Sequence, residues 1–157
     1  MLTFDEVKGL DTPCYVFDEE ELRANLLDFS HALHAGWSED SRVAYSVKTN
    51  PLPWVVEVAR ECGCFAEVVS DDEYELALQC GYPCDQIVFN GPIKGRRFFE
   101  HALENGSLVN IDSKREIRWA KELAEKGERV RLGIRANIML ERYCPGECLS
   151  DDHHGRF

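Results

Sequence analysis

The sequence has 157 residues, enough for a single domain with a sizeable core, and its 44% hydrophobic and 10% aromatic content is typical of a folded globular protein. Its formal net charge of -11 argues against nucleic acid or an anionic membrane as a partner, and no apolar run approaches the roughly 18 residues of a membrane span. The N-terminus carries no cationic leader and the 7 cysteines have no secretory context, so we expect a cytoplasmic protein with reduced thiols.

The first predicted elements are a leading strand over residues 12–18 and a helix that follows it. Asp18 and Glu21 have the spacing of a capping box, in which each side chain bonds the other residue's backbone amide. Up to Gly36, apolar residues recur at helical spacing, which predicts a helix with one apolar face. The residues of that face are Leu22, Leu26, Phe29 and Leu33.

Five βα units are predicted over residues 43–137. The expected strands begin near residues 43, 65, 87, 108 and 130, so their spacings are 22, 22, 21 and 22. Two of the intervening helices begin with Ser-x-x-Glu capping boxes, at Ser70 and Ser113, and glycines close the helices. Such a regular alternation of strand and helix implies a parallel sheet.

Two architectures suit a parallel sheet, an open doubly wound sheet and a (β/α)8 barrel. In the open sheet the central strands are apolar on both faces, because helices cover both sides. The last expected strand differs, since Leu132 and Ile134 share one face. Gly133, Arg135 and Asn137 share the other face. One apolar row and one small or polar row favour the barrel, whose interior narrows toward a site at the C-terminal strand ends.

The predicted fold class is therefore α/β, an incomplete (β/α)8 TIM barrel with about five of its eight units present. Residues 138–157 form a truncated tail in this interpretation, because no further apolar element follows residue 137. We expect residues 1–157 to be the N-terminal part of a larger barrel domain.

A lysine ends the strand expected over Val43–Lys48. Alternation places Lys48 on the same face as Ala44 and Ser46, which are both small. Partial burial there would favour the neutral amine, which can condense with a carbonyl compound. A solvated charge at the end of a strand is the alternative interpretation.

The polar rows of the expected strands end at one rim of the predicted barrel. The side chains that reach this rim are Lys48, Glu67, Asn90, Asp112, Arg135 and Asn137. A lysine among carboxylates, amides and an arginine is the composition of a small-molecule site.

Six short motifs, taken together, resemble one family. They are Thr-Pro-Cys-Tyr-Val-Phe-Asp at 12–18, Tyr-Ser-Val-Lys-Thr-Asn at 45–50, Glu-Val-Val-Ser at 67–70, Asn-Gly-Pro-Ile-Lys at 90–94, Val-Asn-Ile-Asp-Ser at 109–113 and Gly-Ile-Arg-Ala-Asn at 133–137. In order and spacing they resemble the fold-type III pyridoxal-phosphate decarboxylases of diaminopimelate, ornithine and arginine. The resemblance implies an alanine racemase-like barrel.

The resemblance also implies roles for three residues. Lys48 would bind pyridoxal 5′-phosphate covalently through its amine and later take part in proton transfer. Glu67, where the family usually has aspartate, would be a charge partner near the lysine and the cofactor, and Arg135 would lie at the cofactor rim. An amino acid substrate and a homodimer are implied as well, with the phosphate loop and the partner-subunit residues beyond Phe157.

Simpler roles stay open for the residues of the rim. Glu67 can be a solvated acid at the end of a strand, and Arg135 can be a structural ion-pair partner. Asn90 and Asp112 suit a turn and a helix cap, since Asp-Ser-x-x-Glu is itself cap chemistry.

The function also has alternatives, namely an amino acid racemase of the same barrel type and a non-catalytic fragment that binds pyridoxal phosphate. No metal site is expected, because the cysteines and histidines near the C-terminus match no common zinc pattern. Those residues are Cys144, Cys148, His153 and His154.

Overall fold

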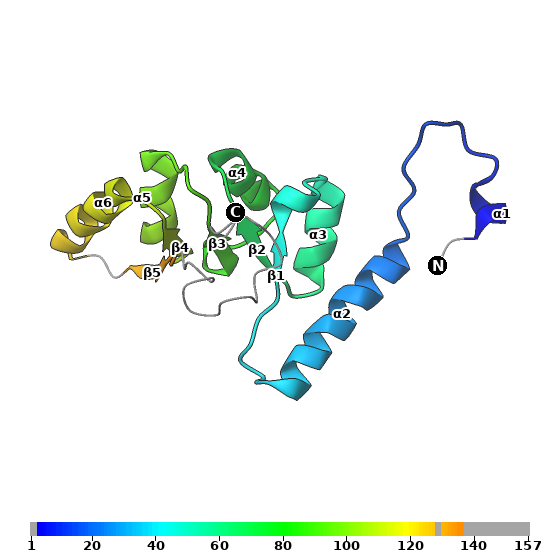
Figure 1. Ribbon diagram of the computed structural model, residues 1–157, viewed down its shortest axis with the longest axis horizontal. Coiled ribbons are helices and arrows are strands. Elements are labelled where there is room, and N and C mark those ends of the chain that lie inside the picture. The colour runs from blue at the N-terminus through cyan, green and yellow to red at the C-terminus, as the bar shows by residue number, and fades with distance from the viewer. Residues whose placement is uncertain (1–2, 128–129, 137–157) are drawn as a thin grey trace, which may run out of the picture.

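A five-stranded parallel sheet organises residues 3–127 and 130–136, the part of the chain that the computed structural model describes (Figure 1). Its strands lie in chain order: β1 (Ala44–Ser46), β2 (Phe65–Val68), β3 (Ile87–Phe89), β4 (Leu108–Ile111) and β5 (Arg131–Ile134). Four helices alternate with them: α3 (Pro53–Glu61), α4 (Asp71–Gln79), α5 (Arg96–Glu104) and α6 (Lys114–Glu125). A doubly wound sheet would reverse its strand order, so the sequential order confirms the partial barrel.

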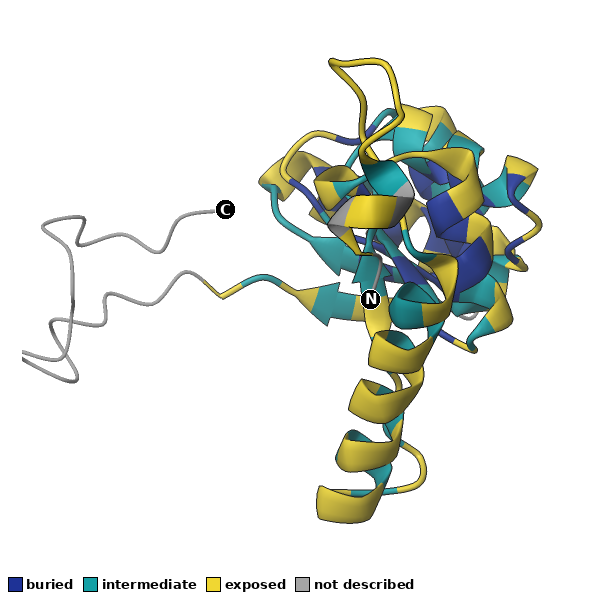
Figure 2. Ribbon diagram, turned by 90° about the vertical axis from the view of Figure 1, so that its right-hand side faces the viewer, coloured by how far each residue is buried: buried dark blue, intermediate teal, exposed yellow. Residues whose placement is uncertain are grey.

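The two faces of β2, β3 and β4 differ in burial, whereas Leu132 and Ile134 on β5, the predicted apolar row, are 39% and 83% exposed. Ala66, Val68, Ile87, Phe89 and Val109 lie on the helix side and are buried. Figure 2 shows that the buried residues gather between the sheet and its helices. On the opposite face, the register pairs Ser46 with Glu67 and Asn110 with Gly133, and these residues are only half-buried.

Helix α2 (Glu19–Gly36) comes before the sheet, after the short helix α1 (Phe4–Val7), and projects beside α3 (Figures 1 and 2). The predicted cap is present, because Asp18 Oδ1 accepts a hydrogen bond from the Glu21 amide at 3.1 Å. Arg23 Nη2 joins α2 to α3 through Glu61 Oε2 at 2.6 Å. No residue of α2 is fully buried. Of its predicted apolar face, Leu22, Leu26 and Leu33 are half-buried and Phe29 is 62% exposed, so this face packs only in part on the described chain. None of the described helices is both long and apolar enough to cross a bilayer.

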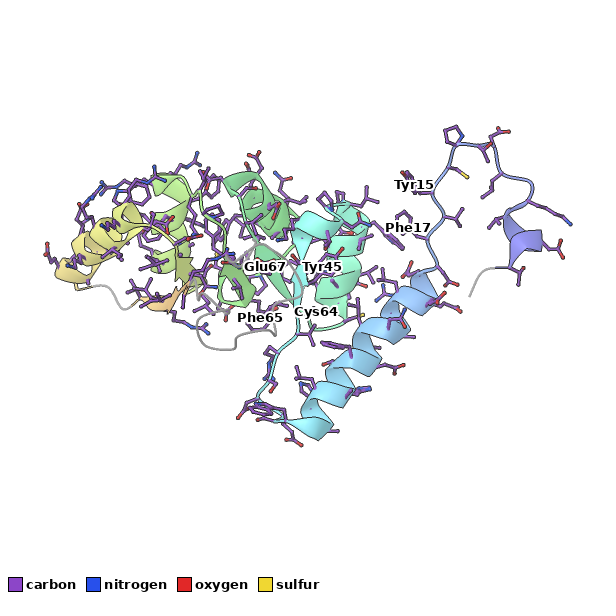
Figure 3. All side chains as sticks on the ribbon, in the orientation of Figure 1. Tyr15, Phe17, Tyr45, Cys64, Phe65 and Glu67 are labelled. Carbon is purple, nitrogen blue, oxygen red and sulfur yellow. The ribbon has the colours of Figure 1, made fainter. Side chains whose placement is uncertain are left out.

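The prediction of a leading strand over residues 12–18 is wrong for this structure. The segment runs without ladder hydrogen bonds, and Tyr15, Val16 and Phe17 are exposed (Figure 3). A strand needs a neighbour that pairs with its backbone, and no described strand lies beside this segment. Asn137 and the tail over 138–157 fall outside the described residues.

Candidate functional site

Ser46 and Glu67 lie side by side at the C-terminal ends of β1 and β2, where the βα loops begin. They are register partners, and the Ser46 hydroxyl donates a hydrogen bond of 2.6 Å to Glu67 Oε2. Figure 3 shows Glu67 on β2, next to Tyr45 on β1. The hydroxyl therefore fixes one carboxylate oxygen of Glu67 on the polar face of the sheet.

Lys48 lies on the 3-10 turn η1 (Val47–Thr49) rather than at the end of β1. The strand ends at Ser46, because Val47 turns into the core and the Thr49 hydroxyl donates to the Ser46 carbonyl. Lys48 is exposed, so the expectation of a partly buried amine is wrong. Within the described part of the chain, no hydrogen bond or ion pair occupies its amine, which leaves the nitrogen available to a ligand.

Lys94 is the buried lysine of this end of the sheet. Its Nζ donates to the carbonyl oxygens of Gly91 at 2.6 Å and Asn110 at 2.9 Å, and it lies 3.5 Å from Glu116 Oε2. Burial lowers the pKa of Lys94, and the nearby carboxylate of Glu116 opposes that shift. All of its donors point at protein oxygens, so Lys94 is a structural cation that joins the loop after β3 to β4 and α6.

Glu116 extends this network toward Arg135. Its backbone amide donates to Ser113 Oγ at 3.3 Å, and its Oε2 accepts from the Asp112 amide at 2.8 Å. Asp112 Oδ2 in turn lies 3.8 Å from Arg135 Nη1. The first turn of α6 thus holds the loop after β4, and that loop holds an ion pair with the residue that follows β5. This contact supports the simpler role of Arg135 as an ion-pair partner.

Two glycines allow the loops after β2 and β3 to approach each other. Gly91 has φ +87, and a Cβ there would overlap the carbonyl of Val69. A Cβ at Gly95 would overlap the carboxylate of Asp71, which accepts a hydrogen bond from the Gly95 amide at 3.0 Å. Between the loops lies a shallow hollow of about 350 Å³, lined by Val69, Ser70, Asp71, Asp72, Pro92, Ile93 and Gly95.

The structure brings the predicted residues to one end of the sheet in two separate pairs. Glu67 pairs with Ser46, and Asp112 pairs with Arg135, while no hydrogen bond or ion pair joins Lys48 to Glu67 among the described residues. Asn90 holds a backbone role, since its amide donates to the Val68 carbonyl at 2.7 Å.

The network of Lys94 and Glu116 was not predicted. The sequence carried one signal for this network, the Ser113–Glu116 capping box. This box lies one strand after Lys94, the lysine that follows a Gly-Pro turn.

These features define a class, a partial α/β barrel whose free lysine and strand-end acid lie at the C-terminal rim. The comparisons define the family. The chain belongs to the family described as pyridoxal-dependent decarboxylase, pyridoxal binding domain, whose model it matches over residues 19–151. The family confirms the predicted fold-type III resemblance and pyridoxal phosphate as its cofactor.

Three similar proteins are diaminopimelate decarboxylases. That of Bacteroides thetaiotaomicron is 34% identical over 123 residues, which cover 76% of this chain and 31% of the relative. That of Aquifex aeolicus is 30% identical over 128 residues, 80% of this chain and 29% of the relative. The Helicobacter pylori enzyme in complex with L-lysine has a TM-score of 0.72 and 25% identity, covering 86% of this chain and 34% of that one. The chain thus spans about a third of the length of these proteins.

The residues at the rim fit a pyridoxal cofactor in their chemistry. A covalent aldehyde ligand needs a free amine, and Lys48 offers one, whereas the donors of Lys94 are already in use. The Glu67 carboxylate on β2 and the Arg135 guanidinium after β5 supply opposite charges at the same end of the sheet, with β3 and β4 between their strands.

Proposed function

We propose that this chain is the N-terminal part of a cytoplasmic pyridoxal-phosphate-dependent decarboxylase, in which Lys48 binds the cofactor. The observation that carries the proposal is the unoccupied amine of Lys48, one strand away from the Glu67 carboxylate, in a family defined by a pyridoxal binding domain. When bound, the cofactor supplies an electron sink for the carbanion that remains after carbon dioxide leaves.

The chain's own residues would prepare the site for that chemistry. The Lys48 amine gives the covalent attachment and accepts or returns a proton at Nζ. Ser46 holds the Glu67 carboxylate in place, so its negative charge has a fixed position near the attached cofactor. Asp112 restrains Arg135 at the rim, where a guanidinium can bind an anionic group.

The proposed substrate is diaminopimelate or a related basic amino acid such as ornithine or arginine, and the proposed assembly is a homodimer. The names of the relatives and the L-lysine in the Helicobacter pylori complex support a basic amino acid. A second candidate is a fragment that binds the cofactor without catalysis.

Reduction with borohydride tests the role of Lys48. The chain is mixed with pyridoxal phosphate and reduced, and peptide mapping then locates the phosphopyridoxyl label. We expect the label on Lys48, and we expect Lys48→Ala to lose it together with the absorbance of the bound cofactor. Lys121→Ala, which removes an exposed lysine on α6, is the matched control and should keep both signals. Label spread evenly over the exposed lysines would overturn the assignment.

A further inference from the structure

Cys84 and His101 form a thiol–imidazole pair at the opposite end of the sheet from Lys48. Cys84 begins the 3-10 turn η2 (Cys84–Gln86), which leads into the N-terminal end of β3, and His101 lies in the last turn of α5. Cys84 Sγ is 3.9 Å from His101 Nε2, and both residues are half-buried. The pair takes no part in the proposed cofactor site.

Asn105 fixes which ring nitrogen of His101 carries the proton. Its Nδ2 donates to the His101 carbonyl at 2.8 Å, which settles the orientation of the amide, and the same Nδ2 lies 3.3 Å from His101 Nδ1. An amide nitrogen can only donate, so Nδ1 is the acceptor. In the neutral ring the proton is then on Nε2, which faces the Cys84 sulfur.

The surroundings hold both partners in place. The Tyr74 ring packs edge-on against His101, with ring centroids 6.1 Å apart. Ser107 Oγ donates to the Cys84 carbonyl at 2.6 Å and lies 2.9 Å from the Tyr74 hydroxyl. Burial raises the pKa of Tyr74 and outweighs the lowering by its hydrogen bond with Ser107, so the Tyr74 hydroxyl stays protonated and donates to Ser107 Oγ.

The other described cysteines lack this arrangement. Cys14 is exposed and Cys62 is half-buried, and no described histidine contacts either thiol. Cys64 and Cys80 are buried, and burial raises the pKa of each thiol. A raised pKa leaves less thiolate, the form of cysteine that reacts.

We propose that Cys84 is a site of covalent modification by soft electrophiles and reacts ahead of Cys62, Cys64 and Cys80. The N–H of His101 faces the sulfur at 3.9 Å and donates to it once the thiol proton has left to water. The sulfur electron pair then forms a bond to the electrophilic carbon, and the leaving group departs with the electrons of the bond that breaks. With iodoacetamide, the products are a thioether and iodide.

A timed alkylation of the native chain tests the proposal. The chain is treated with iodoacetamide at neutral pH, samples are quenched and denatured, and N-ethylmaleimide blocks the remaining thiols before peptide mass spectrometry. We expect Cys84 to react about threefold or more faster than Cys62, because an N–H donor faces its sulfur and no described histidine faces that of Cys62. Cys62 is the matched control, since its side chain is also half-buried.

Two variants of His101 test whether the hydrogen bond, rather than solvent exposure, sets the alkylation rate of Cys84. His101→Phe keeps a ring against Tyr74 but removes the donor, so the rate at Cys84 should fall to that of Cys62. His101→Gln retains an N–H and should preserve part of the difference, and His31→Phe, at an exposed histidine of α2, should leave it unchanged. A wild-type Cys84 that reacts no faster than Cys62, or a rate unaffected by His101→Phe in a variant with native circular dichroism, would overturn the proposal.

Discussion

The Nζ atom of Lys94 lies 3.5 Å from Oε2 of Glu116, with both side chains buried. The lysine follows β3 and the glutamate opens α6, so this ion pair joins two consecutive βα units. Each partner also bonds the backbone, Lys94 through the carbonyls of Gly91 and Asn110 and Glu116 through the amide of Asp112. The pair therefore sets the positions of the loops that carry the rim.

Breaking this pair from one side should destabilise the chain strongly. Lys94→Met and Glu116→Gln should each lower the free energy of unfolding by about 3–5 kcal/mol, because the remaining partner keeps unmatched polarity in the core. The double variant should lose less than the sum of the two. Urea unfolding measures all three, and Arg96→Met, which breaks an exposed pair with Glu122, serves as the control that should change little.

The lowered pKa of Lys94 makes the contribution of this residue to the free energy of unfolding depend on pH. Burial lowers this pKa from the usual 10.5, so at high pH the folded chain releases the proton before the unfolded chain does. The unfolded state then binds more protons, and stability rises with pH toward 10.5. The difference in unfolding free energy between wild type and Lys94→Met should be constant at pH values below the lowered pKa of Lys94. It should grow between that pKa and pH 10.5. A difference that shrinks there would contradict the lowered pKa.

Alanine substitutions at Gly91 and Gly63 distinguish the energetic cost of a left-handed backbone from the cost of steric overlap. Both have positive φ, +87 and +80, but only Gly91 has a neighbouring carbonyl in the space of a Cβ. Gly63→Ala should cost about 1–2 kcal/mol, the price of the left-handed conformation. Gly91→Ala should cost clearly more, because the Val69 carbonyl must move and the loops after β2 and β3 must separate. Equal losses in urea unfolding would show that the close approach is unimportant.

The unpaired edges of β1 and β5 should make the 157-residue chain self-associate. No described strand pairs with the outer side of either one, and Ile134 on β5 is 83% exposed. Sedimentation at micromolar concentration should show oligomers, and Ile134→Lys should reduce them. Ile93→Lys is the control, since Ile93 is 74% exposed but lies in a loop. A cooperatively melting monomer of the wild-type chain would exclude the edges as interfaces.

The 157-residue chain should also release no carbon dioxide from diaminopimelate, ornithine, arginine or lysine above the rate of free pyridoxal phosphate. It spans about a third of its relatives, and the family's phosphate loop and partner-subunit residues are expected beyond Phe157. Manometry or a coupled carbon dioxide assay checks this. Measurable decarboxylation would show that the described units already contain the catalytic groups.

The repeating elements could be predicted because their signals are local. Ser70 Oγ accepts from the Glu73 amide and Ser113 Oγ from the Glu116 amide, as the capping boxes indicated. Strand alternation placed Glu67 correctly on the polar face, but it failed for β5, where Leu132 and Ile134 are exposed. Helix caps and strand alternation depend on neighbours within a few residues, so the sequence carries them directly.

The site was harder to predict because its details depend on distant parts of the chain. The prediction that β1 extends to Lys48 overlooked the turn that Val47 and Thr49 make. It therefore predicted a partly buried Lys48, whereas the buried lysine in the structure is Lys94. The groups that hold the Lys94 amine, the Glu116 carboxylate and the Asn110 carbonyl, lie in other units. No pattern around Lys94 alone contains that information.

The sequential order of the sheet has a consequence for synthesis on the ribosome. Each strand from β2 onward pairs with the strand translated just before it, and no pairing in the described sheet waits for a later segment. Domains generally fold from the N-terminus as they are made, so each βα unit can dock on its finished predecessor while the next is still being translated. The growing edge is then covered by the next strand to emerge, which shortens the time during which it is open to other chains.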